Sequence, residues 1–308
     1  MELHVAPMQG YADYLWLKNF CDVYGAPDVC YTPFIRVEKG RARHQDMARL
    51  VKSVEMGLPI VPQIIFGSVD EFALLVDSLR GLGIDRIDLN LGCPYPMMTR
   101  RGRGAAMVGN VAVMEKVARR IEADTDMRYS VKMRPGMECP DEWERLMPLL
   151  NALPLAHVAM HARTARQMYD GQADTDVFAR FYDACGHPVA YNGDIVAWGD
   201  IGRVAARFPG VAGVMVGRGL LGCPSLFAEW RRGGEWDDVV RMECLRRFHD
   251  ALLGDYRAGL CGDTQVLQHL KPFWQYLEPV IGRRASKAIR KAATLRRYDE
   301  AIRGIFGV

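Results

Sequence analysis

One cysteine stands where a chemical role is expected. Cys93 lies between Gly92 and Pro94, where a short apolar segment gives way to a loop. An unperturbed thiol has a pKa of about 8.5, so it is protonated at neutral pH and can donate its proton. No neighbouring residue supplies a base that would convert it to a thiolate. We therefore predict that Cys93 acts as a general acid.

The other seven cysteines are interpreted as packing residues. The closest two of the eight are nine positions apart, so the chain has no Cys-x-x-Cys pair for a metal or for redox chemistry. We expect reduced thiols that pack as small hydrophobic side chains. No spacing of His, Cys and carboxylate residues indicates a metal site.

Polar residues end several other apolar segments. Lys132 lies within Ser130–Arg134, and because lysine is rarely buried without a partner, an inward-facing lysine suits an anionic ligand. The alternative is a lysine at a frayed strand end that faces solvent. His161 and Asn192 are weaker candidates, since a single histidine is more often structural than a ligand.

Two glycine-rich segments favour a phosphate site. Gly193 follows Asn192, and Gly217, Arg218 and Gly219 follow the last apolar segment. Glycine lets backbone N–H groups approach an anion, and a guanidinium matches its oxygen atoms. The alternative is that these glycines only make tight turns.

Eight short apolar segments must position these residues. Their first residues are 25 to 42 positions apart, and helix-like stretches such as Val69–Leu82 lie between most of them. Strands and helices that alternate at this spacing predict a (β/α)8 TIM barrel, in which function collects at the carboxyl ends of the strands. An open doubly wound sheet is the alternative, but no Gly-x-Gly-x-x-Gly follows the first segment. The segments are Leu3–Met8, Val29–Phe34, Ile60–Phe66, Ile87–Leu91, Tyr129–Met133, His157–His161, Pro188–Asn192 and Gly213–Gly217.

The pattern changes near the C-terminal end. From Asp237 onward the apolar residues have helical spacing and β-branched residues are few. We predict a barrel domain over residues 1–236 and an all-α domain over 237–308. The net charge of +3 is divided unevenly, because residues 271–308 carry nine basic and three acidic side chains. With 49% apolar and 25% charged residues and no apolar run of about 18, the chain is expected to be a cytoplasmic monomer without a membrane span.

Taken together, the motifs resemble those of the tRNA-dihydrouridine synthases. They occur in that family's order over about residues 5 to 224, with Ala162 as a departure where glycine is common. Each motif is weak alone, and their order at predicted strand ends makes the signal specific. The segments are Ala6–Gly10, Asn90–Pro94, Gly102–Ala106, Ser130–Arg134, His161–Thr164, Tyr191–Asp194 and Gly217–Gly219.

The resemblance implies an FMN-containing barrel followed by a helical domain, with NADPH as the reductant. The implied reaction reduces the C5=C6 bond of a uridine in tRNA, expected in the D-loop, with Cys93 giving a proton to C5. The implied flavin contacts are Pro7, Met8, Gln9, Gln63, Lys132 and His161 along the ring and its tail, and Asn192, Gly193, Asp194, Gly217 and Arg218 at the phosphate end.

The same resemblance implies contacts with tRNA. Asn90, Arg163 and Tyr169 would face the target base, which must be turned out of its stack into the barrel. Basic side chains near Cys93 and in the helical domain would attract phosphates, although charged runs are often only solvated surface. They are Arg36, Arg100, Arg101 and Arg103, and Lys271, Arg283, Arg284, Lys287, Arg290 and Lys291.

Two other functions fit part of the pattern. A dihydroorotate-dehydrogenase-like flavin enzyme acting on a free small molecule would share the barrel residues but would not need a basic helical domain. A catalytically inactive barrel that only binds tRNA would not need Cys93, Lys132 and Arg218 together. The sequence does not indicate which uridine is modified.

Overall fold

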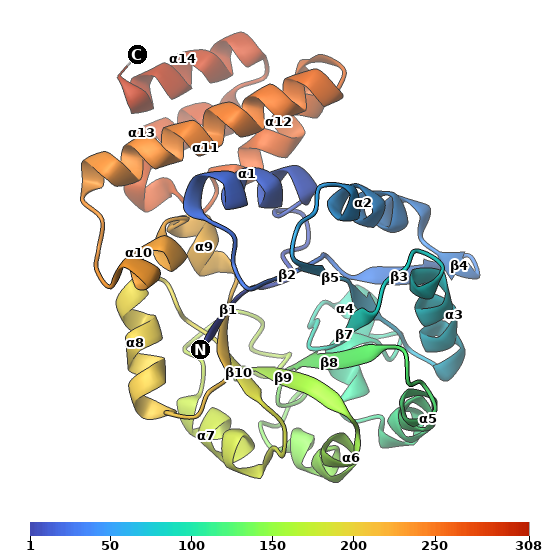
Figure 1. Ribbon diagram of the computed structural model, residues 1–308. Coiled ribbons are helices and arrows are strands. Elements are labelled where there is room, and N and C mark those ends of the chain that lie inside the picture. The colour runs from blue at the N-terminus through green and yellow to red at the C-terminus, as the bar shows by residue number, and fades with distance from the viewer. Residues whose placement is uncertain (308) are drawn as a thin grey trace. The chain divides into compact units, whose positions relative to one another are not determined.

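The computed structural model describes residues 1–307, and its strands form a ring (Figure 1). β1 (Glu2–Val5) pairs with β11 (Gly213–Val216) on one side and with β2 (Val29–Tyr31) on the other. Every pair in this ring is parallel, as expected when helices connect the strands. The remaining strands are β3 (Ile35–Glu38), β4 (Arg41–Ala42), β5 (Ile60–Val61), β6 (Gln63–Ile65), β7 (Arg86–Leu91), β8 (Arg128–Met133), β9 (Leu155–His161) and β10 (Val189–Asn192).

Two positions in the ring are interrupted strands. β2 pairs with β5 and β3 pairs with β6, so β2 and β3 share the second position and β5 and β6 share the third. Pro62 separates β5 from β6, because proline has no N–H to donate to a strand ladder. Counted this way, eight parallel positions close on themselves. The predicted (β/α)8 barrel is confirmed, and all eight predicted strands are present.

The connecting helices α2, α3, α5, α6 and α7 lie outside the ring of strands (Figure 1). In α3 the Ser68 hydroxyl caps the first turn, and buried residues at Phe72, Leu75, Val76 and Leu79 form one apolar face. The helices are α1 (Tyr14–Tyr24), α2 (His44–Glu55), α3 (Val69–Arg80), α4 (Pro96–Thr99), α5 (Val111–Glu122), α6 (Met147–Ala152), α7 (Thr175–Ala184), α8 (Trp198–Arg207), α9 (Arg218–Gly222), α10 (Leu226–Arg232), α11 (Asp238–Gly259), α12 (Gly262–Phe273), α13 (Glu278–Lys291) and α14 (Leu295–Phe306), with 3-10 turns at Gly104–Met107 and Glu142–Arg145.

A short hairpin extends the second strand position and was not predicted. β3 and β4 pair antiparallel, with Val37 opposite Ala42. Their two-residue turn, Lys39–Gly40, has φ angles of 52° and 73°, which is the backbone of a type I′ turn. Because Lys39 is a non-glycine residue in the left-handed region and the flanking residues are charged, the local sequence carries only a weak hairpin signal.

The Tyr31 ring packs inside the barrel among alanines and larger apolar side chains, with the rings of His4 and His157 beside it. Tyr31 packs with Ala6, Ala159, Ala190 and other buried residues from the surrounding strands. Its hydroxyl lies 2.7 Å from Nε2 of His157 at the start of β9. Burial, together with a smaller effect of the nearby His4, lowers the pKa of His157 to about 4. His157 is therefore neutral in the folded barrel at physiological pH.

Acid should weaken the barrel through His157. The folded-state pKa of about 4 lies below the unfolded value of 6.5, so the unfolded chain gains a proton first as the pH falls. The stability that neutral His157 contributes is complete above pH ~6.5 and is lost between there and pH ~4, by up to roughly 3 kcal/mol. Urea denaturation across this range should show a flatter pH dependence for His157→Gln than for the wild type. Equal slopes for the two proteins would show that another group carries the effect.

The described chain divides into two compact units. The first comprises Met1–Pro7, Asp28–Asp194 and Gly202–Val216 and contains every barrel strand; the second comprises Met8–Pro27, Ile195–Ile201 and the residues from Gly217 onward. Within the second unit, the Phe248 ring of α11 packs against Trp16 and Phe20 of α1. The predicted boundary between residues 236 and 237 stays a prediction. Among the helices over residues 1–307, none is long and apolar enough to cross a membrane.

Candidate active site

Polar side chains meet at the carboxyl ends of the barrel strands. β7 contributes Asn90 and β8 contributes Lys132, each one residue before its strand ends, and β9 ends at His161. Gln63 lies deeper, because it is the first residue of β6 and pairs in register with Asp88. Because the strands are parallel, these ends lie at the same side of the ring. The sequence placed its candidate residues at this end, where a ligand of a (β/α)8 barrel normally binds.

A chain of hydrogen bonds runs from a buried carboxylate to Cys93. Gln63 donates from Nε2 to Asp88 Oδ2 at 2.7 Å, and Asn90 donates from Nδ2 to Gln63 Oε1 at 2.6 Å. Asn90 Oδ1 in turn accepts the backbone N–H of Cys93 at 2.8 Å. Ser130 also donates to Asp88, at 2.6 Å. These bonds fix the start of the loop that carries the thiol.

Sequence reasoning missed Asp88 and Ser130. Asp88 is 0% exposed, and burial raises the pKa of its carboxyl to about 6, against the lowering effect of its hydrogen bonds to Gln63 and Ser130. The available signal was a charged residue inside the apolar stretch Arg86–Leu91, on the same face of the strand as Asn90. An acidic residue on an inward face needs partners, and both partners come from other strands.

The thiol of Cys93 is nearly enclosed. Cys93 is 8% exposed and packs against Ile65 and Met98, with Phe34 at the edge of the cluster. Burial raises the pKa of the thiol, while the backbone at Tyr95 and the nearby Arg134 and Lys132 lower it. Burial is the largest of these effects, so the thiol is protonated at neutral pH. This state suits a proton donor better than a nucleophile.

Gly104 allows the next loop to close over Cys93. Gly104 has a φ of 63°, and a Cβ built on it would lie 2.6 Å from the carbonyl oxygen of Cys93 and 2.9 Å from its Cβ. The backbone N–H of Ala105 donates to that same carbonyl at 3.0 Å. Any side chain at position 104 would therefore push the cysteine out of place.

Lys132 presents a cation without a fixed partner. No hydrogen bond or ion pair joins its Nζ to another group in the described chain. Its pKa is lowered to about 8, mainly by burial and also by the charge of Arg134, while Asp88 and Cys93 act in the opposite direction. A half-buried ammonium of this kind gains when an anionic or strongly polar ligand binds beside it. Over residues 1–307, no group of three His, Cys, Asp or Glu side chains is placed to hold a metal ion.

Arg134 supports the loop that follows β9. Its side chain is 1% exposed, and its Nη1 donates to the carbonyl of Thr164 at 2.8 Å and to that of Arg163 at 3.3 Å. Its guanidinium carbon lies 5.3 Å from the centre of the Tyr169 ring. Arg134 therefore holds Tyr169, which is 40% exposed, against the mouth of the barrel.

Arg163 is engaged in structural contacts. It is 2% exposed, and its Nη2 donates to both carboxylate oxygens of Asp194 at 2.7 Å and to the carbonyl of Gly171 at 2.6 Å. Its Nη1 lies 3.2 Å from Nε2 of His161. Asp194 also accepts the N–H of Ala173 at 2.7 Å. The structure thus directs Arg163 and Asp194 toward each other, and their predicted contacts with base and cofactor stay predictions.

The remaining cofactor candidates fall in both units. In the first, Asn192 donates to the carbonyl of Met215 at 2.6 Å, and Gly193 is so close to Ala173 that a Cβ would approach it to 2.7 Å. Pro7 is also in the first unit. Met8, Gln9, Gly217 and Arg218 belong to the second, where Gly217 directly precedes α9.

A family model for dihydrouridine synthases matches residues 4–300. The chain belongs to the dihydrouridine synthase family. The family predicted from the ordered motifs is therefore confirmed, and the matched segment extends well beyond those motifs into the helical region.

Named members of the dihydrouridine synthase family match at about one third identity. The tRNA-dihydrouridine(16) synthase of Cupriavidus necator is 30% identical over 289 residues, which cover 88% of each chain. The mouse tRNA-dihydrouridine(47) synthase [NAD(P)(+)]-like protein is 34% identical over 198 residues. That match covers 63% of this chain but only 30% of the mouse protein, and a probable tRNA-dihydrouridine synthase of Mycobacterium tuberculosis is covered over 59% of its length.

Solved structures share the barrel fold at low identity. The old yellow enzyme from Trypanosoma cruzi aligns with a TM-score of 0.56 at 11% identity, over 77% of this chain and 89% of that protein. Morphinone reductase aligns with a TM-score of 0.51 at 14% identity, over 78% and 88%. At such identities the likeness shows the fold alone.

The basic residues predicted to contact tRNA lie mostly at the surface of their own units. In this family member Arg100 and Arg101 are exposed, and Arg36 is partly buried. In the second unit Lys271 is only partly exposed and donates from Nζ to the carbonyl of Arg290 at 3.2 Å. The exposed cations of α13 are Arg283, Arg284, Lys287, Arg290 and Lys291.

Alkylation of Cys93 should distinguish a protonated thiol from a thiolate. Since burial raises its pKa, Cys93 should react with iodoacetamide more slowly at pH 7.5 than the exposed Cys139 and Cys261, and its rate should still be rising above pH 9. Mass spectrometry of each cysteine peptide over a pH series measures this. Lys132→Met should raise the midpoint further, because Lys132 lowers the pKa of this thiol. Faster labelling of Cys93 than of the exposed cysteines at pH 7.5 would contradict the acid role.

Proposed function

We propose that this chain is an FMN-dependent tRNA-dihydrouridine synthase that uses NADPH and reduces the C5=C6 bond of a uridine in tRNA. The observation that carries the proposal is the hydrogen-bonded placement of Cys93 beside Lys132 in the mouth of a barrel of this family. The names of the relatives support the substrate class. We also propose that the protein acts as a monomer in the cytoplasm.

The residues of the mouth fit a flavin. Lys132 supplies a cation without a protein partner, which matches the negative charge that a reduced flavin ring carries. His161 ends the neighbouring strand, and Pro7 follows β1. When bound, FMN supplies the hydride that reaches C6 of uracil. Gln63 acts through its bond to Asn90, since it is 0% exposed and both ends of its amide are engaged.

The phosphate end of the cofactor is assigned to the ends of the last two strands. Asn192 and Gly193 follow β10, and Gly217 and Arg218 follow β11. Glycine backbone and a guanidinium are suited to phosphate oxygens. The carboxylate of Asp194 is neutralised by Arg163, so it would not repel the anion. Met8 and Gln9 complete the proposed contacts.

Cys93 completes the reduction by giving its proton to C5 of uracil. Burial keeps the thiol protonated until C5 of uracil, which gains negative charge during the reduction, is placed beside it. Once the proton has left, the charges of Arg134 and Lys132 stabilise the thiolate that remains. Asn90 fixes the backbone of the donor through its bond to the Cys93 N–H. Tyr169, held over Arg134, gives the flipped base an aromatic surface.

Substrate attraction is assigned to the cations of α13 together with Lys271, Arg36, Arg100 and Arg101. Each phosphate contact releases counterions, so the affinity for tRNA should fall as salt rises. The relatives' names carry different positions, 47 and 16. Because the position-16 relative matches over 88% of both chains, we propose position 16 in the D-loop as the target.

Lys132 should make flavin affinity depend on pH. A ligand that stabilises the ammonium raises its pKa above the ligand-free value of about 8, so affinity is highest below pH ~8 and falls as the pH rises beyond it. Fluorescence titration of FMN at pH 7 and 9.5 should show this fall in the wild type. Lys132→Met should bind roughly tenfold more weakly at pH 7 and should lose most of the difference. Parallel curves for both proteins would remove Lys132 from the flavin site.

Deletion of the gene, followed by mapping of dihydrouridine in every tRNA, tests the function directly. We expect loss of dihydrouridine at position 16, restored by the wild-type gene and not by Cys93→Ala. Purified Cys93→Ala should still bind FMN and be reduced by NADPH, but should turn over tRNA at least about 100-fold more slowly. Unchanged dihydrouridine at every position, in a cell without a second enzyme for the same site, would contradict the proposed function. Near-normal turnover by Cys93→Ala would instead contradict the proton donor.

A further inference from the structure

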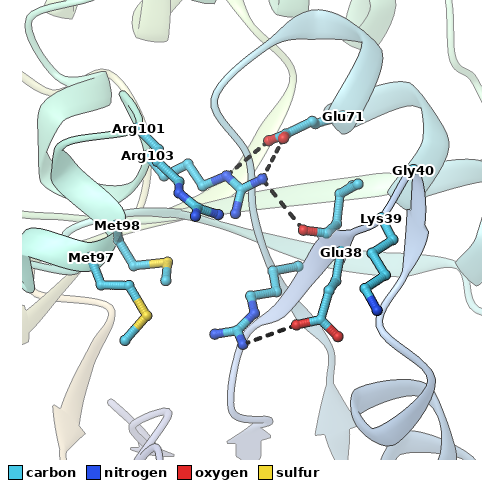
Figure 2. Close-up of a pocket in the computed structure, with 10 residues that line it drawn as sticks. Glu38, Lys39, Gly40, Glu71, Met97, Met98, Arg101 and Arg103 are labelled. Atoms are coloured by element: carbon cyan, nitrogen blue, oxygen red, sulfur yellow. Dashed lines mark hydrogen bonds and ion pairs between the residues drawn. The ribbon is translucent and has the colours of Figure 1, made fainter.

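A pocket lies beside the Cys93 loop and outside the proposed flavin contacts. It has a volume of about 490 Å³ and lies between the β3–β4 turn, α3 and the loop that follows Cys93 (Figure 2). Its walls carry the cations Arg36, Lys39, Arg101 and Arg103 against the carboxylates Glu38 and Glu71, so the pocket has a positive balance. All of these residues belong to the barrel unit.

The carboxylates of this pocket are already neutralised. Glu71 binds Arg103 through Nε at 3.0 Å and through Nη2, and it also accepts the N–H of Gly67 at 2.8 Å. Glu38 is paired with Arg36 at 3.6 Å and with Arg43 at 3.7 Å. Lys39 and Arg101 have no ion pair within residues 1–307. A ligand would therefore encounter cations rather than acids.

Arg103 carries a buried donor that nothing in the described chain satisfies. Its side chain is held by Glu71 and by the carbonyl of Val37 at 3.4 Å, and the residue is 5% exposed. Its third guanidinium nitrogen, Nη1, is buried without a hydrogen-bond partner. Leaving such a donor unpaired in a protein is costly, and a phosphate oxygen is the partner that a guanidinium fork matches best. A buried arginine with a spare donor in a cationic pocket indicates an anion site.

The pocket also has an apolar wall that continues to the reactive thiol. Figure 2 shows Met97 and Met98 across the pocket from the Glu38–Gly40 turn. Met98 belongs to the same packed cluster as Cys93, so one side chain separates the pocket from the proton donor. Met97, which lines the pocket, is 65% exposed, and Tyr95 two residues earlier in the same loop is 50% exposed. Apolar and aromatic side chains of this kind contact bases and sugars next to a bound phosphate.

We infer that this pocket holds a nucleotide of the RNA strand next to the target uridine, with its phosphate on Arg103 and Arg101. The inference rests on the proposed function for the choice of RNA. A flipped uridine draws its flanking phosphates toward the barrel mouth, and a site one side chain from Cys93 captures one of them. Lys39, at the tip of the β3–β4 hairpin, closes the far side of the site. The phosphate of a dinucleotide cofactor has the same chemistry, so the experiment separates the two sources.

Arg101→Gln tests the pocket without disturbing the buried ion pair. Filter binding of unmodified tRNA transcript should show about tenfold weaker affinity than the wild type, with the slope of log K against log salt smaller by about 1. Arg100→Gln, in the adjacent exposed position outside the pocket, should show a clearly smaller loss. Arg120→Gln, an exposed arginine on α5, is the control for a general charge effect. The KM for NADPH in flavin reduction without tRNA should be the same in all variants.

Arg103→Lys probes the buried donor itself. It keeps the charge facing Glu71 and loses the planar fork, so tRNA affinity should fall by a similar factor, and the lost hydrogen bonds to Glu71 and the Val37 carbonyl should lower the thermal midpoint. If this variant unfolds, Arg101→Gln alone decides. Equal losses for Arg100→Gln and Arg101→Gln would overturn the pocket, and so would a raised KM for NADPH with unchanged tRNA affinity, which would indicate a dinucleotide.

The two proposals fail in distinguishable ways. If no tRNA gains dihydrouridine but Arg101→Gln still binds tRNA more weakly than Arg100→Gln, the pocket stands and the proposed function fails. If dihydrouridine is formed and the two variants bind tRNA alike, the function stands and the pocket fails.

Discussion

The buried carboxylate of Asp88 is the anchor on which the mouth of the barrel depends. It accepts hydrogen bonds from Gln63 and Ser130, which lie on the strands at either side of β7. Gln63 then orients Asn90, and Asn90 holds the N–H of Cys93. A buried acid without these partners would be strongly unfavourable, so the same bonds that stabilise Asp88 also place the proton donor. Geometry at the thiol is thus set by a group that touches no substrate.

The anchor also sets a working range of pH. Burial raises the pKa of Asp88 to about 6 and lowers that of Lys132 to about 8. Between these values the carboxylate is charged and the ammonium is charged, and each favours the charged form of the other. Below the range the anchor takes up a proton, and above it the cation is lost. The thiol of Cys93 remains protonated throughout, because its pKa is raised.

Much of the fold and part of the site were predictable from the sequence. The strand positions follow from the regular spacing of apolar segments. Asn90 and Lys132 are polar residues within such segments, Cys93 follows one of them, and all three lie near the carboxyl ends of barrel strands, where function collects. The β3–β4 hairpin was missed because Lys39 adopts a positive φ at the turn position where Asn, Asp or Gly is usual. The role of Asp88 was missed because it depends on hydrogen bonds from Gln63 and Ser130, which are distant from it in the sequence. Contacts of this kind have no local signature.

The roles of two buried arginines could not be predicted from the local sequence. Arg163 and Arg103 both lie within motif segments, and both are nearly fully buried. The guanidinium of Arg163 makes hydrogen bonds to Asp194, the Gly171 carbonyl and His161, and these bonds hold the loop after β9. In Arg103, Nε donates to Glu71 and Nη2 donates to the Val37 carbonyl, whereas Nη1 has no hydrogen-bond partner among the described residues. Only the count of satisfied hydrogen-bond donors separates a structural arginine from one that can bind a ligand, and that count requires the fold.

The same count of hydrogen-bond partners distinguishes Lys132, which has none within residues 1–307, from Lys271, whose ammonium donates to a backbone carbonyl. Cations that are hydrogen-bonded to the protein position a site, and cations without a protein partner are available to bind its ligand.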